Sequence, residues 1–149
     1  MNRLMLAIAS LALCLQAAYA ADDARLERNK KAVLDFYDKG LNQKDFAAAS
    51  KHFGATYIQH NPIAADGPEG FKAFVEFLKS KFPQSKSEVK RVFTDGDYVV
   101  VHVHAVREPG TRGSAIVDIF RCDSNGKIVE HWDVRQDIPE KAANANGMF

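Results

Sequence analysis

Hydrophobic residues recur every three or four positions through the first half of the chain beyond residue 20, which is the spacing of amphipathic helices. In the clearest case Pro68 stands at the first helical position, a wide apolar stripe follows, and Pro83 ends the segment. For the first helix, Asp22 and Asp23 are candidate caps and Gly40 is a stop signal. We therefore expect three helices, at about residues 22–40, 43–53 and 68–82.

From Ser87 onward the hydrophobic period changes to two, which indicates strands. The predicted strands are Ser87–Thr94, Asp97–Glu108, Ser114–Cys122 and Lys127–Asp137, with Tyr57–Gln59 as a short additional candidate. Short connections make the four an antiparallel meander. The middle strands are apolar on both faces, so both faces must be covered or enclose a cavity. The predicted fold class is α+β, a cone-shaped barrel of three N-terminal helices packed on a strongly curved antiparallel sheet.

The first twenty residues differ in kind from the rest. Arg3 is their only charge, an apolar run extends from Leu4 to Leu15, and an A-x-A site ends at Ala20. This pattern predicts a secretory signal peptide over residues 1–20, with an uncleaved anchor as the alternative. We therefore expect a secreted or periplasmic protein with one mature domain at residues 21–149.

Composition narrows the class of partner. The 149 residues are 46% hydrophobic and carry 20 Lys and Arg against 19 Asp and Glu, which gives a net charge of +1. Because no block of like charges occurs, we expect no nucleic-acid partner, and no membrane partner after signal cleavage. The mature chain keeps one cysteine, Cys122, so no intrachain disulfide is expected. A small hydrophobic or aromatic molecule is the partner that these features favour.

The candidate chemistry lies in ionisable residues among apolar neighbours. His102 and His104 alternate with valines on one predicted strand, and Asp118 lies among apolar residues on the next. If the connecting loop is the five residues 109–113, Glu108 pairs with Ser114 and His104 stands directly opposite Asp118. The two side chains would then lie within hydrogen-bonding reach.

Two registers are open for the last hairpin. A type I turn with Gly126 in the left-handed position places Trp132 beside Asp118. A two-residue turn shifts the register by one, and the same face then shows His131 and Asp133. Asp at the first turn position and Gly at the fourth favour the first register.

An aspartate between aromatic neighbours is costly to ionise. The first register therefore predicts that the pKa of Asp118 is raised toward neutrality, where a general acid or base works best. The alternative is that Asp118 and His104 form a buried pair that only fixes the sheet. His60 lies on a turn toward the predicted cavity rim, and simple turn chemistry led by Asn61 and Pro62 is its alternative role.

Three blocks of sequence carry a family resemblance: Tyr57–Pro62, Val117–Arg121 and Gly126–Val134. They resemble the SnoaL-like polyketide cyclase family within the nuclear transport factor 2-like superfamily, over about residues 22–149. The resemblance implies a cone-shaped barrel with one deep, mostly apolar pocket and no metal or organic cofactor. It also implies that Asp118 is the acid/base of an intramolecular aldol ring closure, with His104 as the nearby histidine.

The first of three open functions is a cofactor-free enzyme that performs acid/base chemistry next to a carbonyl, such as aldol-type cyclisation or isomerisation. In it Asp118 is the base, His104 orients it or shuttles the proton, and His60 or Tyr57 donates a hydrogen bond to the enolate oxygen.

The second function is a non-catalytic module that binds a small molecule in the same pocket. The candidate substrate-binding residues are Tyr57, His102, Phe120 and Trp132. The third is a metal site formed by His102, His104 and Asp118, although residues two apart on a strand lie about 7 Å apart at Cα. We assign no metal ligands.

Two further expectations concern the surface. An apolar strand face is too hydrophobic to be left in water and predicts a homodimer, in line with the resemblance. That face carries Val99, Val101, Val103, Val117 and Ile119. The C-terminal segment 142–149 ends in Met148 and Phe149, whose burial would hold it at the pocket as a lid.

Overall fold

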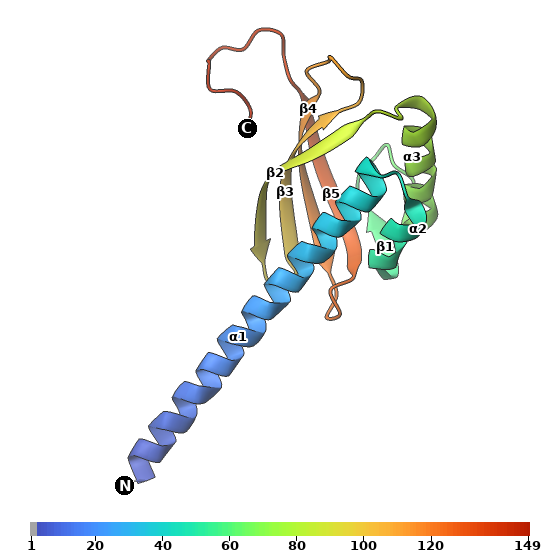
Figure 1. Ribbon diagram of the computed structural model, residues 1–149. Coiled ribbons are helices and arrows are strands. Elements are labelled where there is room, and N and C mark those ends of the chain that lie inside the picture. Colours follow the sequence, from blue (N-terminus) through green and yellow to red (C-terminus); the bar gives the residue numbers. More distant parts are fainter. Residues whose placement is uncertain (1–2) are drawn as a thin grey trace.

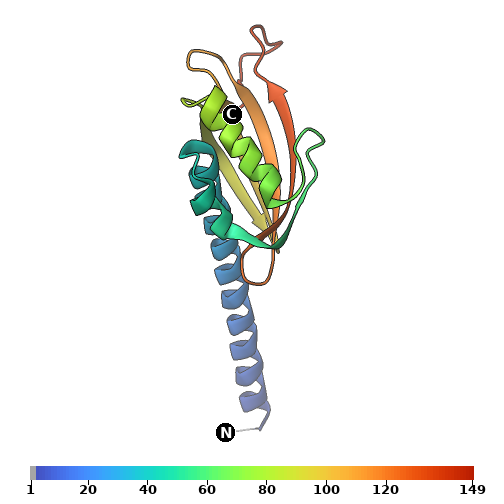
Figure 2. The same cartoon turned by 90° about the vertical axis from the view of Figure 1, so that its right-hand side faces the viewer.

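The computed structural model describes the backbone of residues 3–149, with side chains for residues 16 and 19–149, as helices on one face of a curved sheet (Figures 1 and 2). The helices are α1 (Arg3–Tyr37), α2 (Phe46–Ala49) and α3 (Gly67–Lys81), with a π-helical turn at Asp38–Asn42 and a 3-10 turn at Ser50–His52. The strands are β1 (Phe53–Gln59), β2 (Lys86–Asp95), β3 (Tyr98–Val106), β4 (Ser114–Cys122) and β5 (Ile128–Asp137). The predicted α+β class is confirmed.

The sheet has the order β1-β5-β4-β3-β2. β1 pairs with β5 in parallel, and the other neighbours are antiparallel, as a meander requires. Figure 2 shows α3 lying across one face of the sheet. The core fills the space between that face and the helices, where Val33, Phe36 and Val75 pack with inward residues of the strands. Cys122 is a buried free cysteine in this core.

Two helix boundaries differ from the predicted ones. α1 continues without a break from Arg3, so Asp22 and Asp23 lie inside it and cap nothing. Its first half projects away from the sheet (Figure 1). The second predicted helix shrinks to α2, because the Asp45 side chain caps it by accepting a hydrogen bond from the Ala48 N–H and the chain extends into β1 from Phe53.

None of the described helices combines the length with the apolar character that crossing a membrane needs. The signal peptide and the secreted or periplasmic location stay predictions.

The β3–β4 register differs from the predicted one. Ala105 pairs with Ser114, so eight residues, 106–113, separate the last paired residues of the two strands, where five were predicted. Val101 therefore stands opposite Asp118, and the expectation that His104 faces Asp118 is wrong. The shift is an odd number of residues, and an odd shift moves every side chain of one strand to the other face relative to its neighbour.

This shift also changes which residues share a face. Val99, Val101 and Val103 are 0% exposed and belong to the core, whereas His102 and His104 point to the outer face. Val117 and Ile119 lie on that outer face as well, so the five residues named for a dimer surface do not form one surface. The homodimer itself stays a prediction.

The β4–β5 hairpin has the turn that the sequence favours but the other register. Asp123 N–H donates to Lys127 O at 2.8 Å, and Gly126 has a φ of 77°. Cys122 then pairs with Ile128, but Arg121 pairs with Glu130, so one residue of β5 is extra. This bulge turns the rest of β5 over and moves Trp132 away from Asp118.

We predict that Gly113→Ala lowers the free energy of unfolding by about 3 kcal/mol, measured by urea denaturation. Gly113 has a φ of 76°, and an added Cβ would overlap the carbonyl oxygen of Ala105. Gly110→Ala is the matched control, because Gly110 has a φ of 85° but no atom within 4 Å of its Cβ position. That variant should lose only about 1 kcal/mol of backbone strain. Equal losses for the two variants would contradict the close approach.

Candidate functional site

A cavity of about 700 Å³ lies between the helices and the concave face of the sheet. Most of its wall is aromatic and aliphatic, with side chains from α1, β1, α3, β3, β4 and β5. The polar groups that interrupt this wall are Tyr37, Tyr57, Gln59, Asn61, Asp118, His131 and Asp133, together with charged residues farther along the strands. An apolar cavity with a few convergent polar groups is the usual form of a small-molecule site.

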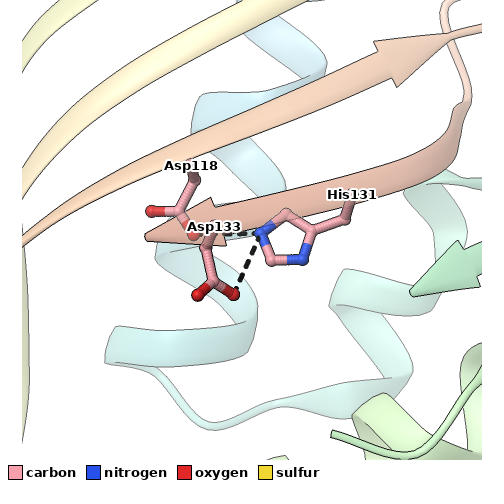
Figure 3. A group of neighbouring side chains, drawn as sticks. All are labelled: Asp118, His131 and Asp133. Carbon is pink, nitrogen blue, oxygen red and sulfur yellow. Dashed lines mark hydrogen bonds and ion pairs between the residues drawn. The ribbon is translucent and has the colours of Figure 1, made fainter. Parts of the chain in front are cut away.

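Asp118 is the centre of the polar cluster. It lies in the middle of β4, and the residue is only 5% exposed. Its Oδ2 accepts a hydrogen bond of 2.9 Å from the Tyr37 hydroxyl on α1, and its Oδ1 lies 2.9 Å from Nε2 of His131 on β5 (Figure 3). Both carboxylate oxygens are thus held by side chains from different elements.

The protonation of His131 follows from its other neighbour, Gln59. Gln59 Oε1 accepts the backbone N–H of Asn61 at 2.9 Å, so that atom must be the oxygen of the amide. The same oxygen lies 3.0 Å from Nδ1 of His131, which must therefore carry a proton and donate it. Since Nε2 of the ring faces a carboxylate oxygen, one further proton must lie between Asp118 and His131, on one partner or the other.

Two phenols border this pair. The pKa of Tyr37 lies well above its ordinary value. Burial is the largest cause of this shift, and the charge of Asp118 is the next. The same two causes raise the pKa of Tyr57. Tyr57 accepts a hydrogen bond of 3.2 Å from Gln59 Nε2, which leaves its own hydroxyl proton available. Both tyrosines therefore stay protonated and can act only as hydrogen-bond donors toward a negative oxygen.

Asp133 completes the group shown in Figure 3. Its carboxylate lies 3.9 Å from His131 Nε2, and both oxygens accept from the Asn61 side-chain amide at 2.8 Å. Ligand atoms of Asp118, His131 and Asp133 all lie within 4.8 Å of one another, which is a spacing that one metal ion could bridge. An ion there would have to replace the hydrogen bond between Asp118 and His131, so the observed geometry suits proton transfer better.

The structure brings together only some of the residues that the sequence suggested. Asp118, Tyr57 and Phe120 line the cavity. The outer face instead carries His104, whose Nε2 lies 2.8 Å from the Arg112 carbonyl oxygen, and His102, whose Nδ1 lies 3.1 Å from Arg91. The metal set of His102, His104 and Asp118 is therefore wrong, because the sheet separates it.

His60 and Trp132 are also outside the cavity. Their rings stack at 4.6 Å with an angle of 5° between the planes, and His60 Nε2 lies 2.9 Å from Glu130 Oε1. The His60 side chain is 40% exposed. His60 lies on the outer face of the sheet because its backbone N–H continues the β1–β5 pairing by donating to the His131 carbonyl.

Five residues of the cluster were not among the predicted site residues: Tyr37, Gln59, Asn61, His131 and Asp133. His131 faced Asp118 only in the disfavoured register of the last hairpin. The bulge in β5 turns the His131 side chain to the face that this register predicted. Tyr37 was assigned to the helical core stripe, and Gln59 was an end residue of a short candidate strand. No local pattern distinguishes these two residues, because their role depends on which side chains of other elements they meet.

The C-terminal tail does not border the cavity, contrary to expectation. The Phe149 ring packs against His104 at 4.8 Å and His102 at 5.2 Å on the outer face. Figure 1 shows the tail and α3 on opposite sides of the sheet. The predicted lid is wrong, because the tail packs against two histidines that face outward.

We predict that deletion of residues 147–149 leaves the affinity and release rate of a cavity ligand unchanged, as measured by calorimetry and stopped-flow mixing. The reason is that Phe149 contacts the outer face alone. The deletion should instead alter the NMR signals of His102 and His104. A faster ligand release in the shortened chain would contradict this placement.

Comparison with known proteins places the chain in a family. The SnoaL-like domain family matches residues 33–131, whereas no curated protein matches. Among solved structures, a putative polyketide cyclase from Bacillus cereus aligns with a TM-score of 0.63 at 19% identity, covering 72% of this chain and 74% of that one. AclR, a putative hydroxylase from Streptomyces galilaeus, aligns with a TM-score of 0.62 at 20% identity, covering 74% and 90%.

TsrD from Streptomyces laurentii aligns with a TM-score of 0.60 at 18% identity, covering 72% of this chain and 87% of that one. At such identities these structures establish a shared fold and no shared reaction. The family match spans well over half of the chain, from the C-terminal end of α1 into β5. The chain therefore belongs to the SnoaL-like family of the nuclear transport factor 2-like superfamily.

Proposed function

We propose that the protein performs acid/base chemistry next to the carbonyl of a small hydrophobic substrate, such as an aldol-type cyclisation or isomerisation. The observation that carries the proposal is the 2.9 Å contact between Asp118 Oδ1 and His131 Nε2 at the wall of a largely apolar cavity. A positioned pair that can accept one proton and return another is what reversible abstraction of a C–H proton needs.

The roles follow from the hydrogen bonds. With the shared proton on His131, the Asp118 carboxylate is the base, and each of its oxygens keeps a lone pair beyond the bonds to Tyr37 and His131. The substrate proton passes to Asp118, and the electron pair of the broken C–H bond forms an enolate. The Tyr57 hydroxyl, whose proton is available, donates to the enolate oxygen. Return of the proton to carbon or oxygen completes the turnover.

The relatives support the reaction class without specifying it. Two solved structures of the same fold, from Bacillus cereus and Acidithiobacillus ferrooxidans, are putative polyketide cyclases. Ring closure by an aldol reaction begins with loss of a proton next to a carbonyl, which is the step that the Asp118 and His131 pair is arranged to perform.

The proposal is tested with 2-tetralone, a small aryl ketone, in D₂O. The protein should accelerate exchange of the ketone's α-protons by roughly 10²-fold or more over buffer, followed by proton NMR. Saturation-transfer NMR measures binding in the same sample. Binding without faster exchange would contradict the enzyme function and favour the alternative, a non-catalytic binding module, for which the apolar wall of the cavity is the supporting observation.

A further inference from the structure

Arg107 is a cationic side chain at the cavity wall that takes no part in the proposed acid/base chemistry. Arg107 directly follows β3, and it continues the odd-numbered series Val99, Val101 and Val103 that points inward. Its guanidinium lies over the rings of Phe74 and Phe82, with centroid distances of 5.1 and 5.9 Å from Cζ. Two aromatic rings thus hold the guanidinium at the cavity wall.

Arg107 has no counterion among the residues that the structure describes. One of its terminal nitrogens is buried and makes no hydrogen bond there. The neighbouring Arg135 differs, because it donates to Ser114 and to Asp137 at 2.8 Å. Burial of Arg107 lowers the pKa of its guanidinium, although an arginine remains charged. A partly buried cation without an anion is costly, so the site is incomplete without an anionic group.

Arg107 shares the cavity with the acid/base pair. Its positive charge acts on Tyr37, where it opposes the burial that raises the pKa of that phenol. Tyr37 in turn donates to Asp118 at 2.9 Å. One molecule in the cavity can therefore contact the guanidinium and the Asp118 carboxylate at two points of its surface.

We propose that Arg107 binds a carboxylate of the substrate, which makes the substrate an apolar or aromatic keto acid. The guanidinium fork matches a carboxylate with two parallel hydrogen bonds, and the negative charge of the carboxylate balances the charge of the guanidinium. Asp118 and Asp133 line the same cavity, and they repel a group with more negative charge than a carboxylate more strongly than they repel a carboxylate. The inference that the substrate carries a carboxylate is drawn from Arg107 alone. The inference that it also carries a ketone rests on the proposed function.

The test compares 2-naphthoate with its neutral amide, 2-naphthamide, by isothermal titration calorimetry. The unmodified protein should bind the carboxylate at least about tenfold more tightly than the amide, because only the carboxylate forms a charged pair. Arg107→Met keeps an apolar stem between Phe74 and Phe82 and should abolish the preference. Arg107→Gln, checked by circular dichroism, serves the same purpose if the Met variant does not fold.

The matched control is Arg91→Met, because Arg91 contacts His102 on the outer face and should not affect the preference. Equal affinities for the two probes, no binding of the carboxylate, or a preference that survives in Arg107→Met would overturn the proposal. Neither probe undergoes proton abstraction, so the result is independent of catalysis. A carboxylate preference without exchange of 2-tetralone would overturn the proposed function alone. Exchange of 2-tetralone without a carboxylate preference would overturn the carboxylate site alone.

Discussion

Asp118→Asn should slow the exchange of 2-tetralone by roughly two to four orders of magnitude, the usual contribution of a positioned acid/base group. The asparagine has nearly the same shape, so the hydrogen bonds to Tyr37 and His131 have partners in the variant. It cannot accept a proton from carbon, however, and the pair loses its base. Ligand binding should persist, because most of the cavity wall is apolar and unchanged.

The control for this variant is His104→Gln. The sequence register predicted His104 as the partner of Asp118, whereas the structure places it on the outer face beside the Arg112 carbonyl. Exchange by His104→Gln should therefore equal that of the unmodified protein. Full activity in Asp118→Asn, with the variant confirmed as folded by thermal melting, would remove Asp118 from the mechanism.

The fold could be predicted from the sequence where the signals are local. Pro68 lies in the first turn of α3, one residue after its start at Gly67, and β4 has the predicted bounds, Ser114–Cys122. The first helix was predicted too short, because no local signal shows that the apolar N-terminal segment continues the same helix. The parallel pairing of β1 with β5 was also beyond local patterns, since it joins strands about 70 residues apart.

The site was harder to predict because it depends on which alternate side chains of each strand face the cavity. Between the last paired residues of β3 and β4 lie eight residues where five were predicted, and one bulge adds a residue to β5. Each change is odd, so each reverses which side chains face the cavity. Asp118 was still recognised, because a carboxylate between apolar residues is visible within its own strand. His131 and Arg107 depend on register between strands, and a single sequence gives no independent measure of register.

Gln59→Leu should reduce the exchange rate by about 10–100-fold, comparable to the loss of a group that orients a functional histidine. Gln59 touches no reacting atom and is a positioning residue. Its oxygen accepts the Nδ1 proton of His131 and so requires that nitrogen to be protonated. Leucine keeps the approximate size of the side chain and removes the acceptor.

An NMR measurement separates this role from a structural one. Nδ1 of His131 faces the Gln59 oxygen, which accepts its proton, and Nε2 faces the Asp118 carboxylate. Leucine removes the acceptor of the Nδ1 proton, so a ring without a proton on Nδ1 becomes easier to reach. The share of His131 rings with a proton on Nδ1, measured from the ring nitrogen signals, should therefore fall in Gln59→Leu.

Gln59→Glu should keep the proton on Nδ1, because a carboxylate accepts it more strongly than an amide oxygen does. Gln136→Leu is the matched control: Gln136 lies on β5 opposite Ala115, outside the Asp118 and His131 hydrogen bonds, and should leave both the Nδ1 proton and the rate unchanged. If Gln59→Leu slows exchange while the Nδ1 proton of His131 stays in place, Gln59 only supports the packing of β1. Loss of that proton in Gln59→Leu and its retention in Gln59→Glu would instead show that this amide sets the proton on the ring, and with it the proton that Asp118 and His131 share.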